Sequence, residues 1–226
     1  QPTLTPTVVA SLLPRTERGA IVVGPHAFAD RHESARALQE LSQLTGWPIL
    51  ADGAGTLRGD LAGTGRLITA YDLILRDEKT AKALAPEAVV VVGPLPTSKA
   101  LRGWLRQADP QILLVGRPGE NTDATHGRWT RLDGALTPGG EVPASPANAA
   151  LRRWQKAQAT AGRRLEKVVA VDWPFEGRVI AQLETALGPD DRLFVGSSMP
   201  IRDLEWFSHP AGPGPAAGPA PGTRSR

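Results

Sequence analysis

Apolar residues gather in short runs along the chain, and segments with helical spacing separate these runs. The clearest run, Ala88–Val92, is apolar at every position, which is typical of a central strand in a parallel sheet with both faces covered. Five further runs predict strands: Gly19–Gly24, Pro48–Ala51, Gln111–Val115, Arg128–Leu132 and Asp191–Val195. The pattern therefore predicts a sheet built mainly of buried strands.

Helices are expected between these strands. Residues 33–44 have apolar side chains at Ala35, Leu38, Leu41 and Leu44, which is the spacing of one helix face. Further helices are expected over residues 67–75, from Thr97 as the cap to Arg106, over 147–165 and over 173–187. The alternation implies right-handed crossovers, so the predicted fold class is α/β, with a Rossmann-like, doubly wound and mostly parallel sheet. Function in such sheets gathers beyond the carboxyl ends of the strands.

Shifts in composition divide the chain into four parts. Residues 1–18 are rich in Pro and Thr and are interpreted as a linker arm. Residues 19–165 form the central Rossmann-like domain, and residues 166–208 are a truncated second α/β unit. Residues 209–226 are mostly Pro, Gly and Ala, a composition that cannot bury enough apolar surface to fold, so a disordered tail is expected there.

Charge and composition change this picture little. The 226 residues are 41% hydrophobic and 22% charged, which is ordinary for a globular protein, and the net charge is only +3. The pairs Arg152–Arg153 and Arg163–Arg164 lie among helix-forming residues, so they predict a solvated helix face and no nucleic-acid surface.

Several absences bear on location and completeness. No apolar stretch approaches the roughly 20 residues that cross a bilayer, so no membrane partner is expected. The lack of cysteine fits a cytoplasmic protein without disulfides. The first residue is Gln1 and the only methionine is Met199, so we expect the sequence to be a piece of a longer protein.

Two turns carry the candidate chemistry. In the first, Gly196 ends an apolar run, Ser197 and Ser198 follow, and a helix that opens with Pro200 carries Arg202. Free backbone amides, two hydroxyls and a guanidinium at one place are suited to holding an anion.

The second turn, 93–99, follows the strand Ala88–Val92 and ends in Lys99, a cation that is poorly placed for the helix dipole unless it faces an anion. Simpler roles stay open: Lys99 as a surface residue, Ser198 as a helix cap, and Arg202 as a partner of Asp203 or Glu205.

Other familiar sites are missing from the sequence. The histidines have no metal-ligand spacing, so no metal ligands are assigned. There is no Gly-x-Gly-x-x-Gly fingerprint after a strand, which argues against dinucleotide binding, and no Gly-x-Ser-x-Gly elbow of a hydrolase.

The residues of both turns match a known family. Phe194–Asp203, which reads Phe-Val-Gly-Ser-Ser-Met-Pro-Ile-Arg-Asp, resembles the start of the diphosphate-side domain of 2-succinyl-5-enolpyruvyl-6-hydroxy-3-cyclohexene-1-carboxylate synthases. Val90–Lys99 resembles the strand and lysine-bearing turn of the family's central domain, as do the loop Asp52–Arg58 and the segment Tyr71–Leu75. The resemblance covers about residues 1–207.

The resemblance implies an activity and a set of ligands. It implies a transferase of menaquinone biosynthesis that uses thiamine diphosphate and Mg²⁺, decarboxylates 2-oxoglutarate and adds the resulting succinic semialdehyde carbanion to isochorismate. It implies that Lys99, Ser198 and Arg202 bind substrate carboxylates or the intermediate, and that Ser197 and Ser198 lie near the cofactor. Some members carry an arginine where this sequence has Ala100, and the full-length enzyme is expected to be a homo-oligomer.

The sequence also departs from the family. The family's amino-terminal domain, with the glutamate that activates the cofactor, and its Gly-Asp-Gly metal motif do not occur in it. We therefore assign no catalytic residue to this chain and expect it to be inactive alone. The alternative is a non-catalytic α/β module that binds small anions or acts as a scaffold.

Overall fold

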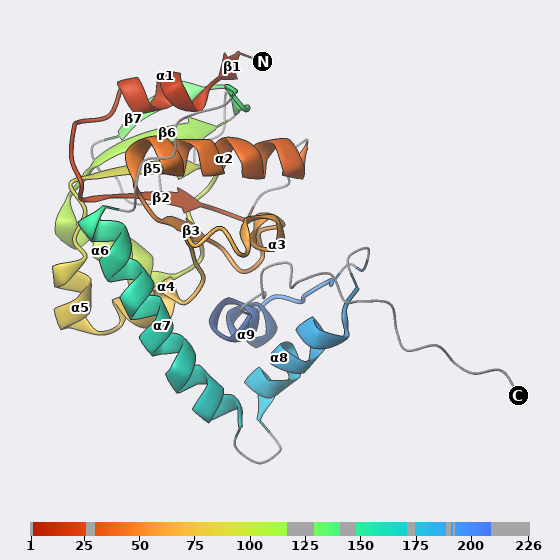
Figure 1. Cartoon of the computed structure of the whole chain (residues 1–226). Coiled ribbons are helices and arrows are strands. Elements are labelled where there is room, and N and C mark those ends of the chain that lie inside the picture. Colours follow the sequence, from red (N-terminus) through yellow and green to blue (C-terminus); the bar gives the residue numbers. More distant parts are fainter. Residues whose placement is uncertain are drawn as a thin grey trace, which may run out of the picture.

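A six-stranded, all-parallel sheet forms the centre of the molecule. The computed structural model describes residues 2–25, 30–116, 129–140, 148–170, 175–188, 191 and 193–208 (Figure 1). The strands are β2 (Gly19–Val23), β3 (Ile49–Ala51), β4 (Leu67–Ile68), β5 (Ala88–Val92), β6 (Gln111–Gly116) and β7 (Trp129–Asp133). Their order is β4-β3-β2-β5-β6-β7, so the direction of winding reverses between β2 and β5. The structure confirms the predicted fold class.

Continuous apolar runs form the strands because both faces of the sheet are covered. In the register of the central strands, Ile21 of β2 lies beside Val90 of β5, and Val90 lies beside Leu113 of β6. All five residues of β2 and all five of β5 are buried. Successive side chains of a strand point to opposite faces, so each central strand contributes to two separate cores.

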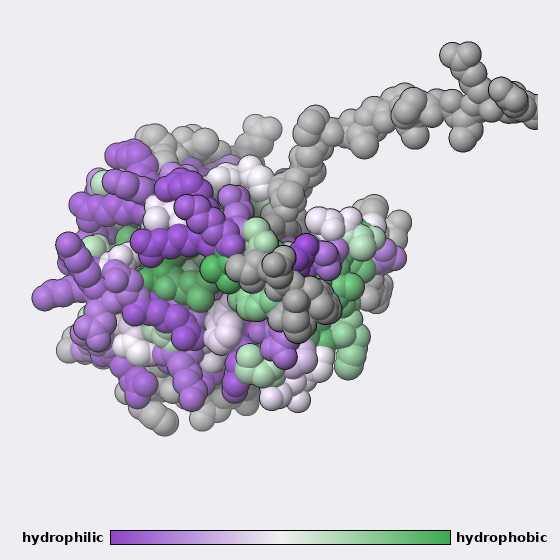
Figure 2. Space-filling model, turned by 90° about the horizontal axis from the view of Figure 1, so that it is seen from below, coloured by the Kyte–Doolittle hydropathy of each residue, from purple (hydrophilic) through white to green (hydrophobic). Residues whose placement is uncertain are grey.

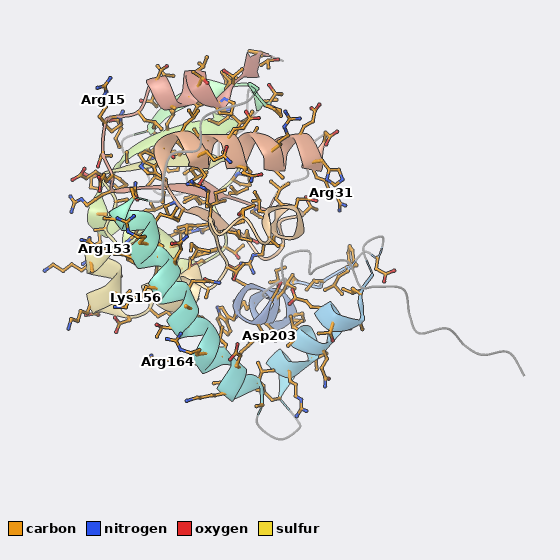
Figure 3. The ribbon with its side chains drawn as sticks, viewed as in Figure 1. Arg15, Arg31, Arg153, Lys156, Arg164 and Asp203 are labelled. Atoms are coloured by element: carbon orange, nitrogen blue, oxygen red, sulfur yellow. The ribbon has the colours of Figure 1, made fainter. Side chains whose placement is uncertain are left out.

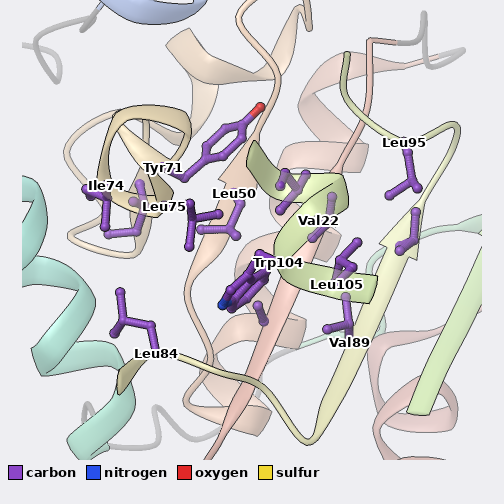
Figure 4. Packing of buried hydrophobic residues seen from close by; sticks show 14 of the residues in the cluster. Val22, Leu50, Tyr71, Ile74, Leu75, Leu84, Val89, Leu95, Trp104 and Leu105 are labelled. Atoms are coloured by element: carbon purple, nitrogen blue, oxygen red, sulfur yellow. The ribbon is translucent and has the colours of Figure 1, made fainter. Parts of the chain in front are cut away.

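One core lies between the sheet and four helices: α4 (Tyr71–Leu75), α5 (Glu78–Ala83), α6 (Lys99–Ala108) and α7 (Ala149–Val169). Val22, Val89 and Leu105 meet in this core (Figure 4). The ring of Trp104 packs edge-on against Trp154 with centroids 5.7 Å apart, and its Nε1 donates to the Ala81 carbonyl at 3.0 Å. The two tryptophans thus join α5, α6 and α7 into one layer.

The opposite face is covered by α1 (Pro6–Ser11), α2 (Arg31–Thr45) and α3 (Leu57–Leu61). Helix α2 begins where the Asp30 carboxylate accepts hydrogen bonds from the amides of residues 32 and 33, and ends at Gly46 with φ of 72°. The proline-rich arm has structure of its own: Val9 of α1 is fully buried, and β1 (Thr3–Leu4) pairs in parallel with β8 (Ala135–Leu136).

In the part of the chain that the structure describes, α7 is followed by α8 (Glu176–Ala186) and α9 (Met199–Phe207). The rings of Phe175 and Phe207 pack edge-on with centroids 5.3 Å apart, which holds the start of α8 against the end of α9. Helix α7 runs without a break through the domain boundary expected near residue 165, and that boundary stays a prediction. Arg153, Lys156 and Arg164 follow the exposed side of α7, which confirms the solvated helix face (Figure 3).

Three local predictions are wrong. Residues 67–75 are not one helix, because Leu67 and Ile68 pair with β3 as the edge strand β4 and only Tyr71–Leu75 is helical. Ser98, not Thr97, caps α6: its Oγ accepts a hydrogen bond from the Leu101 amide at 3.0 Å.

The third error concerns the strand expected over residues 191–195. Its described residues form no strand, because no described strand lies alongside to bond their backbone, and Phe194 is 97% exposed. The tail expected over residues 209–226 lies outside the described residues.

Candidate anion-binding site at the carboxyl edge of the sheet

Asp72 connects the turn that precedes Lys99 to the helix that carries Arg202. The Ser98 hydroxyl, just before Lys99, donates to Asp72 Oδ1 at 2.5 Å. The indole nitrogen of Trp206, in the helix that carries Arg202, donates to Asp72 Oδ2 at 3.0 Å. One buried carboxylate at the start of α4 therefore joins the first residues of α6 to α9.

Arg76 completes the surroundings of this carboxylate. Its Nε donates to Asp72 Oδ2 at 2.8 Å, and its guanidinium lies 4.9 Å from the centroid of the Trp206 ring. The Asp72 side chain is only 4% exposed, so these donors replace the water that an ionised carboxylate would otherwise bind. The junction of α4, α6 and α9 is consequently held by charged and hydrogen-bonded contacts.

Arg58 makes a second buried junction beside the first. Its side chain is 4% exposed and donates to three carbonyl oxygens from separate segments: Nε to Ala51 at 2.9 Å, Nη1 to Ser208 at 3.1 Å and Nη2 to Thr69 at 3.3 Å. Nη2 also lies 3.0 Å from Glu205 Oε1, at ion-pair distance but outside hydrogen-bond geometry. The rigid fork of a guanidinium is suited to several acceptors at once.

Glu205 faces this guanidinium from α9. Its Oε2 accepts a hydrogen bond from the Gly53 amide, and its side chain is 7% exposed. The backbone of Gly53 approaches α9 so closely that a Cβ atom there would lie 2.8 Å from the Glu205 Cα. Burial raises the pKa of Glu205 to about 7; the Arg58 charge opposes this rise and the Asp52 charge adds to it.

Asp52 and Tyr71 line the same buried cluster. Asp52 accepts hydrogen bonds from the Ala54 amide at 2.8 Å and the Thr97 amide at 3.3 Å, which ties the loop after β3 to the turn after β5. The fully buried Tyr71 hydroxyl lies beside Glu205 but outside regular hydrogen-bond geometry, and burial raises its pKa well above the usual value.

The predicted ligand-binding residues lie at the surface around this cluster. Lys99 is the exposed first residue of α6 and, among the described residues, has no ion-pair partner. Arg202 is exposed on α9, where its Nη1 lies 3.8 Å from Met199 Sδ. Neither Asp203 nor Glu205 pairs with Arg202, and Glu205 is engaged by Arg58. Both cations are therefore accessible to a dissolved anion.

Ser197 and Ser198 are also exposed, and Ser198 does not cap α9 with its side chain. Its φ of 74° is one that residues other than glycine rarely adopt, at a cost on the order of 1–3 kcal/mol. No hydrogen bond or ion pair among the described residues links either serine to Lys99. That the four residues share a ligand stays a prediction.

Sequence reasoning missed the buried residues that organise this edge: Arg58, Asp72 and Glu205. A signal existed in part, since the segments containing Arg58 and Asp72 were noticed for their resemblance to the family. The pairing of Arg58 with a residue 147 positions later could not be predicted from either segment alone.

The described residues do not form a complete site for Mg²⁺. Within them no three His, Cys, Asp or Glu side chains cluster in a way that could hold a metal ion. Ser197 and Ser198 offer exposed hydroxyls, and their place near the cofactor stays a prediction. Across the same part of the chain, no helix combines the length and hydrophobicity that a membrane span requires.

The all-parallel sheet with this strand order is that of a Rossmann-like α/β domain. The family model described as "Middle domain of thiamine pyrophosphate" matches residues 9–195, and the chain belongs to this family of domains from thiamine-pyrophosphate enzymes. The expected resemblance is thereby confirmed at the level of the family.

The chain is similar to 2-succinyl-5-enolpyruvyl-6-hydroxy-3-cyclohexene-1-carboxylate synthases. It is 39% identical over 213 residues to that of Thermosynechococcus vestitus, which covers 91% of this chain and 37% of the relative. It is 40% identical over 210 residues to that of Synechococcus elongatus, with coverage of 90% and 35%. The chain thus spans only about a third of the length of these relatives.

Proposed function

We propose that the chain supplies the middle domain and the beginning of the diphosphate-side domain of a 2-succinyl-5-enolpyruvyl-6-hydroxy-3-cyclohexene-1-carboxylate synthase. In this proposal Lys99, Ser198 and Arg202 bind carboxylates of 2-oxoglutarate and isochorismate. The proposal rests mainly on Asp72, which joins the turn before Lys99 to the helix of Arg202 at the carboxyl edge of the sheet.

The chemistry of the substrates suits this edge. Both substrates carry more than one carboxylate, and charge-assisted hydrogen bonds to lysine and arginine are the strongest that side chains offer such groups. Lys99 and Arg202 are exposed and unpaired among the described residues, so binding would not first have to break an internal ion pair. Ser198 would add a hydroxyl donor at the start of α9.

In this proposal Ser197 and Ser198 lie near thiamine diphosphate, and the rest of the synthase supplies the remaining contacts to the cofactor and the ligands of Mg²⁺, for which the described residues hold no metal-binding cluster. We therefore expect no turnover from the chain alone. Incubation of the purified chain with 2-oxoglutarate, isochorismate, thiamine diphosphate and Mg²⁺ tests this expectation. Product formation without added protein would contradict it.

Calorimetric titration with 2-oxoglutarate tests the binding residues. We expect Lys99→Gln and Arg202→Gln each to weaken binding about tenfold, since loss of one charge-assisted hydrogen bond costs about 1.5 kcal/mol. Arg153→Gln removes an exposed charge from α7 and should leave binding unchanged. A flat titration of the unmodified chain would refute the anion site, whatever the variants do.

The alternative, a self-contained anion-binding module, differs in its surface. Leu193, Phe194 and Met199 are 39%, 97% and 39% exposed, and hydrophobic residues occur on the surface beside the C-terminal helices (Figure 2). Such exposure favours a domain that contacts further protein, as in a homo-oligomeric synthase. Sedimentation velocity distinguishes the two: concentration-dependent association supports the proposal, and a strict monomer supports the module. A cytoplasmic location also stays a prediction.

A further inference from the structure

Helix α9 is attached to the carboxyl edge of the sheet through buried polar contacts of Arg58 and Glu205. Near its end, the Ser208 carbonyl accepts a hydrogen bond from Arg58, a residue 150 positions earlier. One turn before, Glu205 pairs with the same guanidinium and accepts from the Gly53 amide. Arg58 is in turn fixed to the sheet's carboxyl edge through the Ala51 and Thr69 carbonyls.

We propose that Arg58 and Glu205 form a latch that holds α9 on the carboxyl edge of the sheet and thereby positions Arg202. Arg202 precedes Glu205 by three residues, so it lies one helical turn away on the same helix. The role of Arg202 in this statement rests on the proposed function, whereas the latch itself does not. Arg58 and Glu205 are positioning residues: both are buried and act through α9.

The helix depends on these contacts because it is short. At nine residues, α9 is below the roughly 12–15 residues at which isolated helices become even marginally stable in water. Further contacts are the hydrogen bond from Trp206 to Asp72, the Arg76 guanidinium over the Trp206 ring, the hydrogen bond from the Ser208 hydroxyl to Glu184, and the packing against α8. A change at the latch should therefore alter how often α9 leaves the sheet edge.

The latch also responds to protons. Three groups lie around the Glu205 carboxyl: Arg58 on α3, Asp52 in the loop after β3 and Tyr71 on α4. On the side of α9 that packs against α8, Asp203 lies near Glu176. Burial outweighs the Arg58 charge and raises the pKa of Glu205 to about 7, so the docked helix binds a proton that the undocked helix releases. Docking should be firmer at pH 6 than at pH 8.

Hydrogen exchange measured by mass spectrometry on the full chain tests the latch. With a pKa of about 7 docked and 4.5 undocked, the docking equilibrium weakens about tenfold between pH 6 and pH 8. We expect residues 199–208 to lose about tenfold protection over this range, after correction for the intrinsic exchange rate. Glu205→Gln should abolish most of this dependence, and any remainder reports Asp203, whose pKa burial also raises.

A matched control is Glu87→Gln, which removes a carboxylate from the exposed pair Arg18–Glu87. It should behave like the unmodified chain. Arg58→Lys keeps the positive charge but loses the guanidinium that donates to three carbonyl oxygens, so it should lower the protection of α9 at both pH values. If this variant does not fold, the result for Glu205→Gln alone tests the latch. Equal protection at pH 6 and pH 8 in the unmodified chain, or the same pH dependence in Glu205→Gln, would overturn the latch.

Binding of 2-oxoglutarate then tests the link to Arg202. We expect binding to weaken by up to tenfold from pH 6 to pH 8 in the unmodified chain and to stay constant in Glu205→Gln. No binding at either pH would refute the proposed function while the exchange result still stands. Unchanged binding under conditions in which exchange shows α9 mostly undocked would refute the positioning of Arg202.

Discussion

Replacement of Glu205 by glutamine should remove most of one strong pH dependence from the stability of this protein. The carboxyl group has a pKa of about 7 in the folded chain and an ordinary value of 4.5 when solvated, mainly because it is buried. Glutamine resembles the protonated form in shape and charge. The substitution therefore fixes the side chain in the state that the folded protein prefers.

The magnitude and sign follow from the two pKa values. The difference of about 2.5 units, at 1.36 kcal/mol per unit, corresponds to about 3 kcal/mol. Because the folded pKa is raised, this contribution is fully present below pH 4.5 and is lost as the pH rises through 7. With the side chain only 7% exposed, solvent screening reduces the effect little.

Urea unfolding at a series of pH values from 5 to 8 measures this contribution. The free energy of unfolding of the unmodified chain should fall relative to that of Glu205→Gln by about 2–3 kcal/mol over the series. The variant should be the more stable protein at pH 8. Parallel pH profiles would refute the reasoning, since they would mean that Glu205 titrates alike in the folded and unfolded chains.

Three further predictions concern the fold around the site. Ser98→Ala should lower the free energy of unfolding by about 1–2 kcal/mol in urea, because it removes the cap of α6 and a donor to Asp72, whereas Thr97→Ala should change it by less than about 0.5 kcal/mol. Gly103→Ala places a Cβ in open space on α6, so it should stabilise the folded protein by about 0.5–1 kcal/mol and raise the melting temperature. Gly53→Ala should lower the melting temperature, because its Cβ would collide with α9. Phe194→Ser should reduce self-association in sedimentation and leave the free energy of unfolding unchanged, since Phe194 is 97% exposed. A clear decrease in the free energy of unfolding would contradict this exposed position.

The sequence by itself determined the sheet. Ala88–Val92 and Ile112–Val115 are apolar throughout, which is typical of strands in a parallel sheet with both faces covered, so the sequence alone indicated these strands. The resemblance of two motifs in the right order likewise identified the family from the sequence alone.

Where local patterns were ambiguous, distant contacts decided the structure. Leu67 and Ile68 suit a helix face and a strand equally well, and pairing with Ile49 and Leu50 made them a strand. The apolar run 193–195 has strand composition, yet no described strand pairs with it.

Only the tertiary structure decided how the candidate site is supported. Arg58, Asp72 and Glu205 are ordinary polar residues in the sequence, and their importance comes from burial against partners up to 150 residues away. The pKa of Glu205 is raised because folding removes its water, and no local sequence pattern encodes that removal. Apolar periodicity is a local property that a sequence displays, whereas the burial of a charge depends on which distant segments fold against it.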